Sequence, residues 1–365
     1  MPSEEDAAEG VAEGAAEGAT DPFARLGQCD HLCFGGGGMK ALNAYVAALY
    51  CLERRVGERW REHAATRVRT YSGASAGAIF ALAMAVGLDA DRIFELLAPP
   101  CSNFRSVIPN PDVSTLWEGY GLERGDVLRS LVGQVLRAGG LSEETTFERL
   151  HALARVDFAC SGTNLTRHAA RRFDRASTPR MPVAHACFIS MCVPILFAPA
   201  VHEDELYVDG ALSDNFPLGA DARPERAAVW CIAPPTRQRV GSWSDYTRAL
   251  VSVGGIAQEA RARALRAEAA MFVCFMERGG EGADEAAVDV DVDEATLARF
   301  RGYGYAGMSA RLQPKLAGVV AALVLVALLC GKRVDEDARA SAPCQRRRAE
   351  EEEGDERSAV CMRSR

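Results

Sequence analysis

The feature that most constrains this chain is a pair of consecutive units, each a short apolar strand, a glycine-rich turn and a helix. Residues 31–34, HLCF, run into four glycines, and helical apolar spacing follows over 39–56. Residues 66–72 form a second predicted strand. GASAG follows at 73–77, and an apolar helix is expected over 76–88. Strands that alternate with helices indicate an α/β fold with a central, mostly parallel sheet flanked by helices.

The rest of the chain predicts further elements of both kinds. Residues 99–113 are rich in Pro, Asn and Ser and are expected to form a loop. Helices are predicted at 122–138, 145–155, 183–192 and 243–275, and strands at 156–162, around Phe173, at 205–210 and at 227–234.

Composition divides the chain into five segments. Residues 1–22 repeat Ala, Glu and Gly, which predicts a disordered acidic segment. A folded domain is expected over 23–276, and an acidic linker or peripheral segment over 277–314. An apolar stretch predicts a transmembrane helix over 315–332, and the charged tail 333–365 is expected to be disordered.

The membrane prediction depends on residues 316–331, which carry no charged side chain and lie between lysines. As a helix they span about 24 Å, less than the roughly 30 Å hydrocarbon core, but flanking lysines can snorkel. A buried helix of the folded domain is the alternative. No signal peptide is recognised, so the folded domain is expected on the cytosolic side of a membrane, or in the cytoplasm if the helix does not span.

Charge and cysteine spacing argue against several classes of function. The formal net charge is −8, and no basic stretch indicates a nucleic-acid partner. The 12 cysteines are scattered without a C-x-x-C pair, which is typical of reduced thiols. The alternating aspartates of 289–293 lack the glycine and the final glutamate of an EF-hand loop. Neither a metal nor a cofactor is expected.

The GASAG stretch places Ser75 between a strand and a helix, which is the arrangement of a nucleophile elbow. Such a turn is sharp, and small residues such as Gly73 and Gly77 avoid clashes with the neighbouring strand and helix. The N-terminus of the following helix also favours negative charge that develops at the serine. A glycine-rich helix start that is merely capped by a serine is the alternative.

The first glycine run, FGGGGMKAL, can present bare N–H groups to an anion. A phosphate loop is excluded because Lys40 is followed by Ala41 rather than by Ser or Thr. A dinucleotide fingerprint fits the spacing, but the next strand ends in the serine turn and not in an acid. The N–H groups of Gly36, Gly37 and Gly38 are therefore interpreted as an oxyanion hole.

A serine nucleophile needs a base, and the sequence offers an aspartate more readily than a histidine. Asp209 ends a predicted strand in VDGALSDNFP and is followed at once by Gly210. None of the 6 histidines follows that strand or has a distinctive setting. An ordinary strand-to-turn aspartate is the alternative for Asp209.

Taken in order, GGGGMK, GASAG and VDGALSDNFP resemble the three motifs of the patatin-like phospholipase family, G-G-G-x-R/K-G, G-x-S-x-G and D-G-G/A. TTFERL, SGTNLT and FISMCVPILFAP are similar to stretches between them. The resemblance covers about residues 28–275 and implies the patatin-like three-layer fold, with the catalytic domain over 23–276. It implies a lipid acyl hydrolase of phospholipase A type, which forms an acyl-enzyme with a Ser75/Asp209 dyad and needs no cofactor.

The resemblance also implies roles for neighbouring residues and for the substrate. Lys40 matches the family's basic position, where it braces the loop or adds positive charge near a lipid phosphate. Ala41 departs from the final glycine of the first motif, which is tolerable if that residue is helical. Gly73, Gly77 and Gly210 are expected to support the site. The substrate is expected to be a membrane phospholipid or another acyl lipid.

Two rival functions remain open. One is an α/β-hydrolase-type esterase with a histidine base, for which His185 and His202 are the residues to test. The other is a catalytically silent, membrane-anchored protein that binds lipid or a partner; retention of both Ser75 and Asp209 argues against it.

Overall fold

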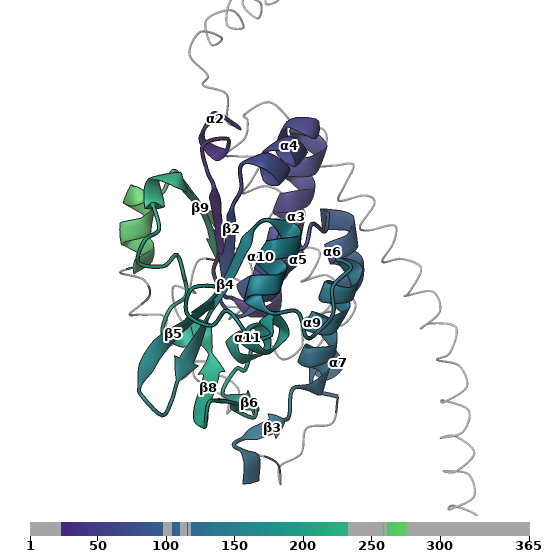
Figure 1. Cartoon of the computed structure of the whole chain (residues 1–365), viewed down its shortest axis with the longest axis vertical. Coiled ribbons are helices and arrows are strands. Elements are labelled where there is room, and N and C mark those ends of the chain that lie inside the picture. The colour runs from purple at the N-terminus through teal and green to yellow at the C-terminus, as the bar shows by residue number, and fades with distance from the viewer. Residues whose placement is uncertain are drawn as a thin grey trace, which may run out of the picture. The chain divides into compact units, whose positions relative to one another are not determined.

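The computed structural model describes residues 23–97, 104–109, 115, 118–232, 258 and 261–275 (Figure 1). The predictions for 1–22, 277–314, 315–332 and 333–365 lie outside these residues and stay predictions. Among the described helices, none has the length and apolar character that a membrane crossing requires.

The strands of the described part form one large sheet and one small one. The large sheet has the order β10-β9-β1-β2-β4-β8-β7, with β5 also paired to β4, and the small one joins β3 and β6. Their bounds are β1 His31–Phe34, β2 Thr70–Gly73, β3 Gly121–Glu123, β4 Asp157–Asn164, β5 Ala169–Asp174, β6 Ile195–Phe197, β7 Ala200–His202, β8 Glu205–Asp209, β9 Ala227–Ile232 and β10 Met271–Phe275.

Helices connect most of these strands. They are α2 Phe23–Leu26, α3 Gly38–Arg55, α4 Glu58–Thr66, α5 Ala76–Ala85, α6 Ala90–Leu97, α7 Phe104–Val107, α9 Asp126–Ala138, α10 Phe147–Ala154 and α11 Val183–Ser190, with 3-10 turns η1 Gly210–Leu212 and η2 Pro224–Arg226. Residues 261–268 are also helical.

The structure corrects four predicted elements. The helix predicted over 243–275 does not continue to its end, because the apolar run 271–275 pairs with β9 as β10. The predicted loop 99–113 contains α7. The helix predicted from residue 122 begins only at Asp126, after β3. The strand predicted from residue 66 begins at Thr70, because Thr66 still ends α4.

The sheet is mostly parallel, as predicted, but only on one side. β10, β9, β1, β2 and β4 pair in parallel. Beyond them, β4 pairs antiparallel with β5 and β8, and β8 with β7. The α/β class and the mainly parallel sheet flanked by helices are therefore confirmed.

Side chains that alternate along β1 and β9 create two apolar layers. On one face, Phe34 and Trp230 pack edge-on at 5.3 Å between ring centroids, and Phe34 also packs against Phe80 of α5. On the other face, Cys33 and Val229 join a buried cluster with Leu265 of the 261–268 helix. Helices thus cover both faces of the sheet, as Figure 1 shows, which is a three-layer arrangement.

The register of β4 explains how the site comes together. β5 pairs along one edge of β4. Some of the same β4 residues also pair with β2, and others with β8. Both β2 and β8 must therefore lie along the other edge of β4. Gly73, the last residue of β2, lies beside Cys160, and Asp209, the last residue of β8, lies beside Gly162. Since β8 runs antiparallel, the carboxyl ends of β2 and β8 face one another two residues apart along β4.

Candidate active site

Ser75 lies at a strained turn between β2 and α5. Its φ is 52° and its ψ −127°, a left-handed backbone that non-glycine residues rarely adopt. Its N–H donates to Ser190 Oγ at 3.0 Å, which fixes the turn from α11. A Cβ at Gly73 would overlap the carbonyl of Gly77, and a Cβ at Gly77 would overlap the carbonyl of Phe34. The predicted need for small residues around this turn therefore has a direct steric cause.

Asp209 meets Ser75 at the junction of the two strands. The Ser75 hydroxyl donates to Asp209 Oδ2 at 2.5 Å, and the N–H of Ala211 donates to Asp209 Oδ1 at 2.8 Å. Burial raises the pKa of Asp209 from 3.8 to about 7, although both hydrogen bonds act in the opposite direction. A carboxylate with a pKa near 7 is suited to accept a proton at neutral pH.

The chain after Asp209 is held closely against β4. Thr163 Oγ1 donates to the Asp209 carbonyl at 2.7 Å, and Ser161 Oγ donates to the Asp214 carbonyl at 2.7 Å. A Cβ at Gly210 would overlap the Ser161 carbonyl, so glycine permits this close approach.

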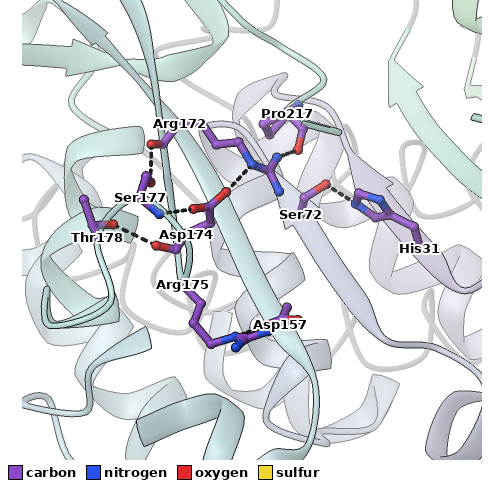
Figure 2. Close-up of polar contacts among 9 residues, drawn as sticks. All are labelled: His31, Ser72, Asp157, Arg172, Asp174, Arg175, Ser177, Thr178 and Pro217. Atoms are coloured by element: carbon purple, nitrogen blue, oxygen red, sulfur yellow. Dashed lines mark hydrogen bonds and ion pairs between the residues drawn. The ribbon is translucent and has the colours of Figure 1, made fainter. Parts of the chain in front are cut away.

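A third anchor for this segment comes from β5. Figure 2 shows that the Arg172 guanidinium donates to the carbonyl of Pro217 and, at 2.6 Å, to Asp174 Oδ2. The segment 209–217 is thereby tied to both β4 and β5.

The glycine loop lies directly against the serine. Gly37 and Gly38 have φ values of 151° and 58°, and α3 begins at Gly38, so their N–H groups belong to a helix N-terminus. A Cβ added to Gly36 would lie 3.1 Å from Ser75 Cβ. The N–H of Gly36, however, donates to Asn215 Oδ1 at 2.6 Å. This amide was predicted to face an oxyanion, and in the structure it has a protein partner instead.

Lys40 and Ala41 occupy the first turn of α3. The Lys40 side chain is 2% exposed, which favours a role in bracing the loop over contact with a solvated lipid phosphate. Ala41 is helical and its φ is not positive, so the expectation that this residue is helical is confirmed.

His31, His185 and His202 contact residues other than Ser75. His31 Nε2 is hydrogen-bonded to Ser72 Oγ at 2.8 Å (Figure 2), and burial lowers its pKa to about 3. His185 Nε2 lies 3.2 Å from the Val201 carbonyl, and the His202 ring packs edge-on against Phe173. Within the described residues, the hydrogen-bond partner of the Ser75 hydroxyl is Asp209 and not a histidine.

Two residues at the site were not predicted as functional. Ser190 and Asn215 lie within FISMCVPILFAP and VDGALSDNFP, but their contacts with Ser75 and Gly36 join residues more than 100 positions apart. No local pattern reveals such pairings. In the described part of the chain, no group of three or more His, Cys, Asp or Glu residues is placed to hold a metal ion.

Comparison with known protein families identifies the family to which this chain belongs. A profile of the patatin-like phospholipase family matches residues 32–221, which include the glycine loop, Ser75 and Asp209. The chain belongs to the patatin-like phospholipase family.

Individual relatives are distant. An uncharacterized protein of Acanthamoeba polyphaga mimivirus is 26% identical over 193 residues, 52% of this chain and 61% of that protein. A probable lipid hydrolase of Invertebrate iridescent virus 6 is 21% identical over 197 residues, 50% of this chain and 66% of the relative. The chain thus spans less than two thirds of either. The crystal structure of VipD from Legionella pneumophila shares the fold, with a TM-score of 0.53 and 17% identity over 78% of this chain and 67% of VipD.

Proposed function

We propose that this protein is a lipid acyl hydrolase of phospholipase A type, in which Ser75 is the nucleophile and Asp209 the general base. The observation that carries the proposal is the 2.5 Å hydrogen bond between Ser75 Oγ and Asp209 Oδ2, in a pair that is less than a tenth exposed. Family membership supports hydrolase chemistry on lipids, and the related viral protein is named a probable lipid hydrolase.

The reaction begins when Asp209 accepts the Ser75 proton and Oγ attacks the ester carbonyl carbon. The resulting oxyanion is held by the N–H groups of Gly37 and Gly38, reinforced by the N-terminal ends of α3 and α5. Collapse breaks the ester C–O bond, and Asp209 returns its proton to the leaving alcohol oxygen.

Deacylation repeats these steps with water. Asp209 takes a proton from a water molecule that attacks the acyl-enzyme carbonyl. The second tetrahedral intermediate then releases the fatty acid, and Ser75 recovers its proton from Asp209. The elevated pKa of Asp209, about 7 because of burial, suits both directions of this transfer.

The test is labelling of the full chain with a fluorophosphonate, followed by hydrolysis of phosphatidylcholine vesicles. Wild type is expected to label, and Ser75→Ala and Asp209→Asn are expected to lose labelling. Ser72→Ala is the matched control, because Ser72 is a buried serine three residues away that is bonded to His31. Retention of labelling in Asp209→Asn would instead direct attention to His185 and His202. Folded wild type that does not label would favour a silent lipid-binding protein.

We further propose that residues 316–331, which lie outside the described residues, anchor the protein in a membrane with the catalytic domain on the cytosolic side. The support for the anchor is an uncharged stretch between Lys315 and Lys332, which gives no preference for either orientation. Leu325→Arg in the full chain is expected to move the protein from the membrane pellet to the supernatant. Leu153→Arg is the matched control, since Leu153 is already 50% exposed on α10. Unchanged fractionation of Leu325→Arg would contradict the anchor.

A further inference from the structure

Asn215 reaches the catalytic centre from the segment that follows Asp209. Its Oδ1 accepts the N–H of Gly36 at 2.6 Å, although 179 positions separate the two residues. A Cβ added to Gly36 would lie 3.0 Å from Asn215 Oδ1 and 3.1 Å from Ser75 Cβ. The carboxamide and the nucleophile therefore flank the same glycine.

Asn215 is itself held in place by a second side-chain amide. Its backbone N–H donates to Gln258 Oε1 at 3.2 Å, and Gln258 Nε2 donates to the Ser213 carbonyl at 2.6 Å. Gln258 thus pairs with the backbone on both sides of Asp214. It lies outside residues 32–221, where the family profile matches.

The glycine loop needs such a restraint because glycine samples backbone conformations that other residues cannot. Oxyanion donors act only when they lie about 2.7–3.1 Å from the developing charge. Gly37 and Gly38, both with positive φ, follow Gly36 directly, so the orientation of the Gly36 peptide helps to set theirs. A fixed acceptor at Gly36 restricts the loop before the substrate arrives.

We propose that Asn215, braced by Gln258, is a positioning residue that orients the glycine loop, so that Gly37 and Gly38 and not Gly36 supply the oxyanion donors. The inference rests on the proposed hydrolase function. Asn215 acts through the loop, so its loss should weaken binding of the transition state and leave binding of the ground state unchanged.

The experiment compares Asn215→Ala with Asn43→Ala in the full chain. Asn43 is a matched control: it is a buried asparagine of α3 whose Nδ2 donates to the Met39 carbonyl at 2.9 Å. The readouts are the fluorophosphonate labelling rate, kcat and KM for p-nitrophenyl butyrate, the inhibition constant of an alkyl trifluoromethyl ketone, and Tm.

Asn215→Ala is expected to lower the labelling rate and kcat about 100-fold, the loss typical of one missing oxyanion donor. The trifluoromethyl ketone forms an oxyanion when it adds to Ser75, so its inhibition constant should rise by a similar factor while KM stays constant. Asn43→Ala should lower Tm without these losses. Gln258→Ala keeps Asn215 but removes its brace, and should slow labelling about fivefold, the equivalent of one net hydrogen bond.

Four outcomes would overturn the inference. Asn215→Ala could label at the wild-type rate, or its loss could lie in KM alone. If Asn215→Ala does not fold, wild-type labelling by Gln258→Ala would count equally against it. Absence of labelling in wild type would overturn the proposed function and this inference together, which separates that failure from the others.

Discussion

The two sides of the central sheet hold the two proposed catalytic residues in different ways. Ser75 follows the parallel side, where β2 lies between β1 and β4 and the turn is enclosed by backbone atoms of the glycine loop. Asp209 follows the antiparallel side, where β8 pairs with only three residues of β4. Steric contact on two sides and one hydrogen bond to Ser190 fix the serine turn. In the segment after Asp209, the close approach at Gly210 is joined by three side-chain hydrogen bonds, from Ser161, Thr163 and Arg172.

This difference predicts different responses to mutation. A turn fixed by overlapping backbone has no room to relax, so an added methyl group should disrupt the fold. A segment fixed by several separate hydrogen bonds should lose them one at a time, each with a modest effect.

The largest effect is expected from Gly77→Ala. The new Cβ would overlap the Phe34 carbonyl and lie 2.6 Å from the Gly35 carbonyl, and neither backbone group can move without displacing β1. We expect a loss of about 3 kcal/mol or more in the free energy of unfolding, measured by urea denaturation, or a failure to fold.

Gly119→Ala is the control for this substitution. Its φ is not positive, and the nearest atom to an added Cβ, Thr115 Cγ2, is 3.7 Å away. Gly119→Ala should leave the free energy of unfolding close to that of wild type. Similar stability of the two variants would show that the serine turn is not held by steric contact.

The elements on either side of the glycine loop and the serine turn were predicted well from the sequence. β1, α3 and α5 were expected within three residues of their observed ends, because apolar strands, glycines and helical spacing are local signals. Ser75 was proposed as a nucleophile from the residues beside it, and Asp209 as its base chiefly from the family resemblance. The structure places the two side chains within hydrogen-bond distance. The meeting of β2 and β8 along one edge of β4 was not predicted, because strand pairing is not encoded in any short stretch. The Asn215–Gly36 contact was missed for the same reason.

The next effect concerns Asp209 and pH. Because burial raises the pKa of Asp209 to about 7, this proposed base is protonated in acid. The fluorophosphonate labelling rate should fall about tenfold per pH unit below 7 and level off above it. A midpoint near pH 4, as for a solvated aspartate, would contradict the burial of the base.

The same pKa makes a prediction about stability. The folded protein holds a proton on Asp209 that the unfolded chain releases between pH 3.8 and about 7. This stabilising contribution is complete below pH 3.8 and is lost as the pH rises through 7. Asp209→Asn has no such loss, so its Tm should exceed that of wild type at pH 8 and approach it at pH 4. Equal Tm differences at both pH values would show that the charge on Asp209 is not the cause.

The smallest effect is expected from Thr163→Val, which tests the antiparallel side directly. Thr163 Oγ1 donates to the Asp209 carbonyl and lies 2.8 Å from Ser213 Oγ. Valine keeps the shape of the side chain and removes the hydroxyl, so about 1 kcal/mol of stability should be lost, measured by urea denaturation. Because the lost bonds hold Asp209 against β4, labelling should also slow about fivefold.

Thr178→Val provides the control for Thr163. Thr178 Oγ1 donates to the Asp174 carbonyl at 3.1 Å, in the turn after β5 shown in Figure 2. It should lose similar stability and label at the wild-type rate, because its partner does not belong to the segment that carries Asp209. Equal labelling by both valine variants would mean that the base is held by strand pairing alone. In that case the two sides of the sheet would hold Ser75 and Asp209, the proposed catalytic residues, in the same way, by backbone contacts.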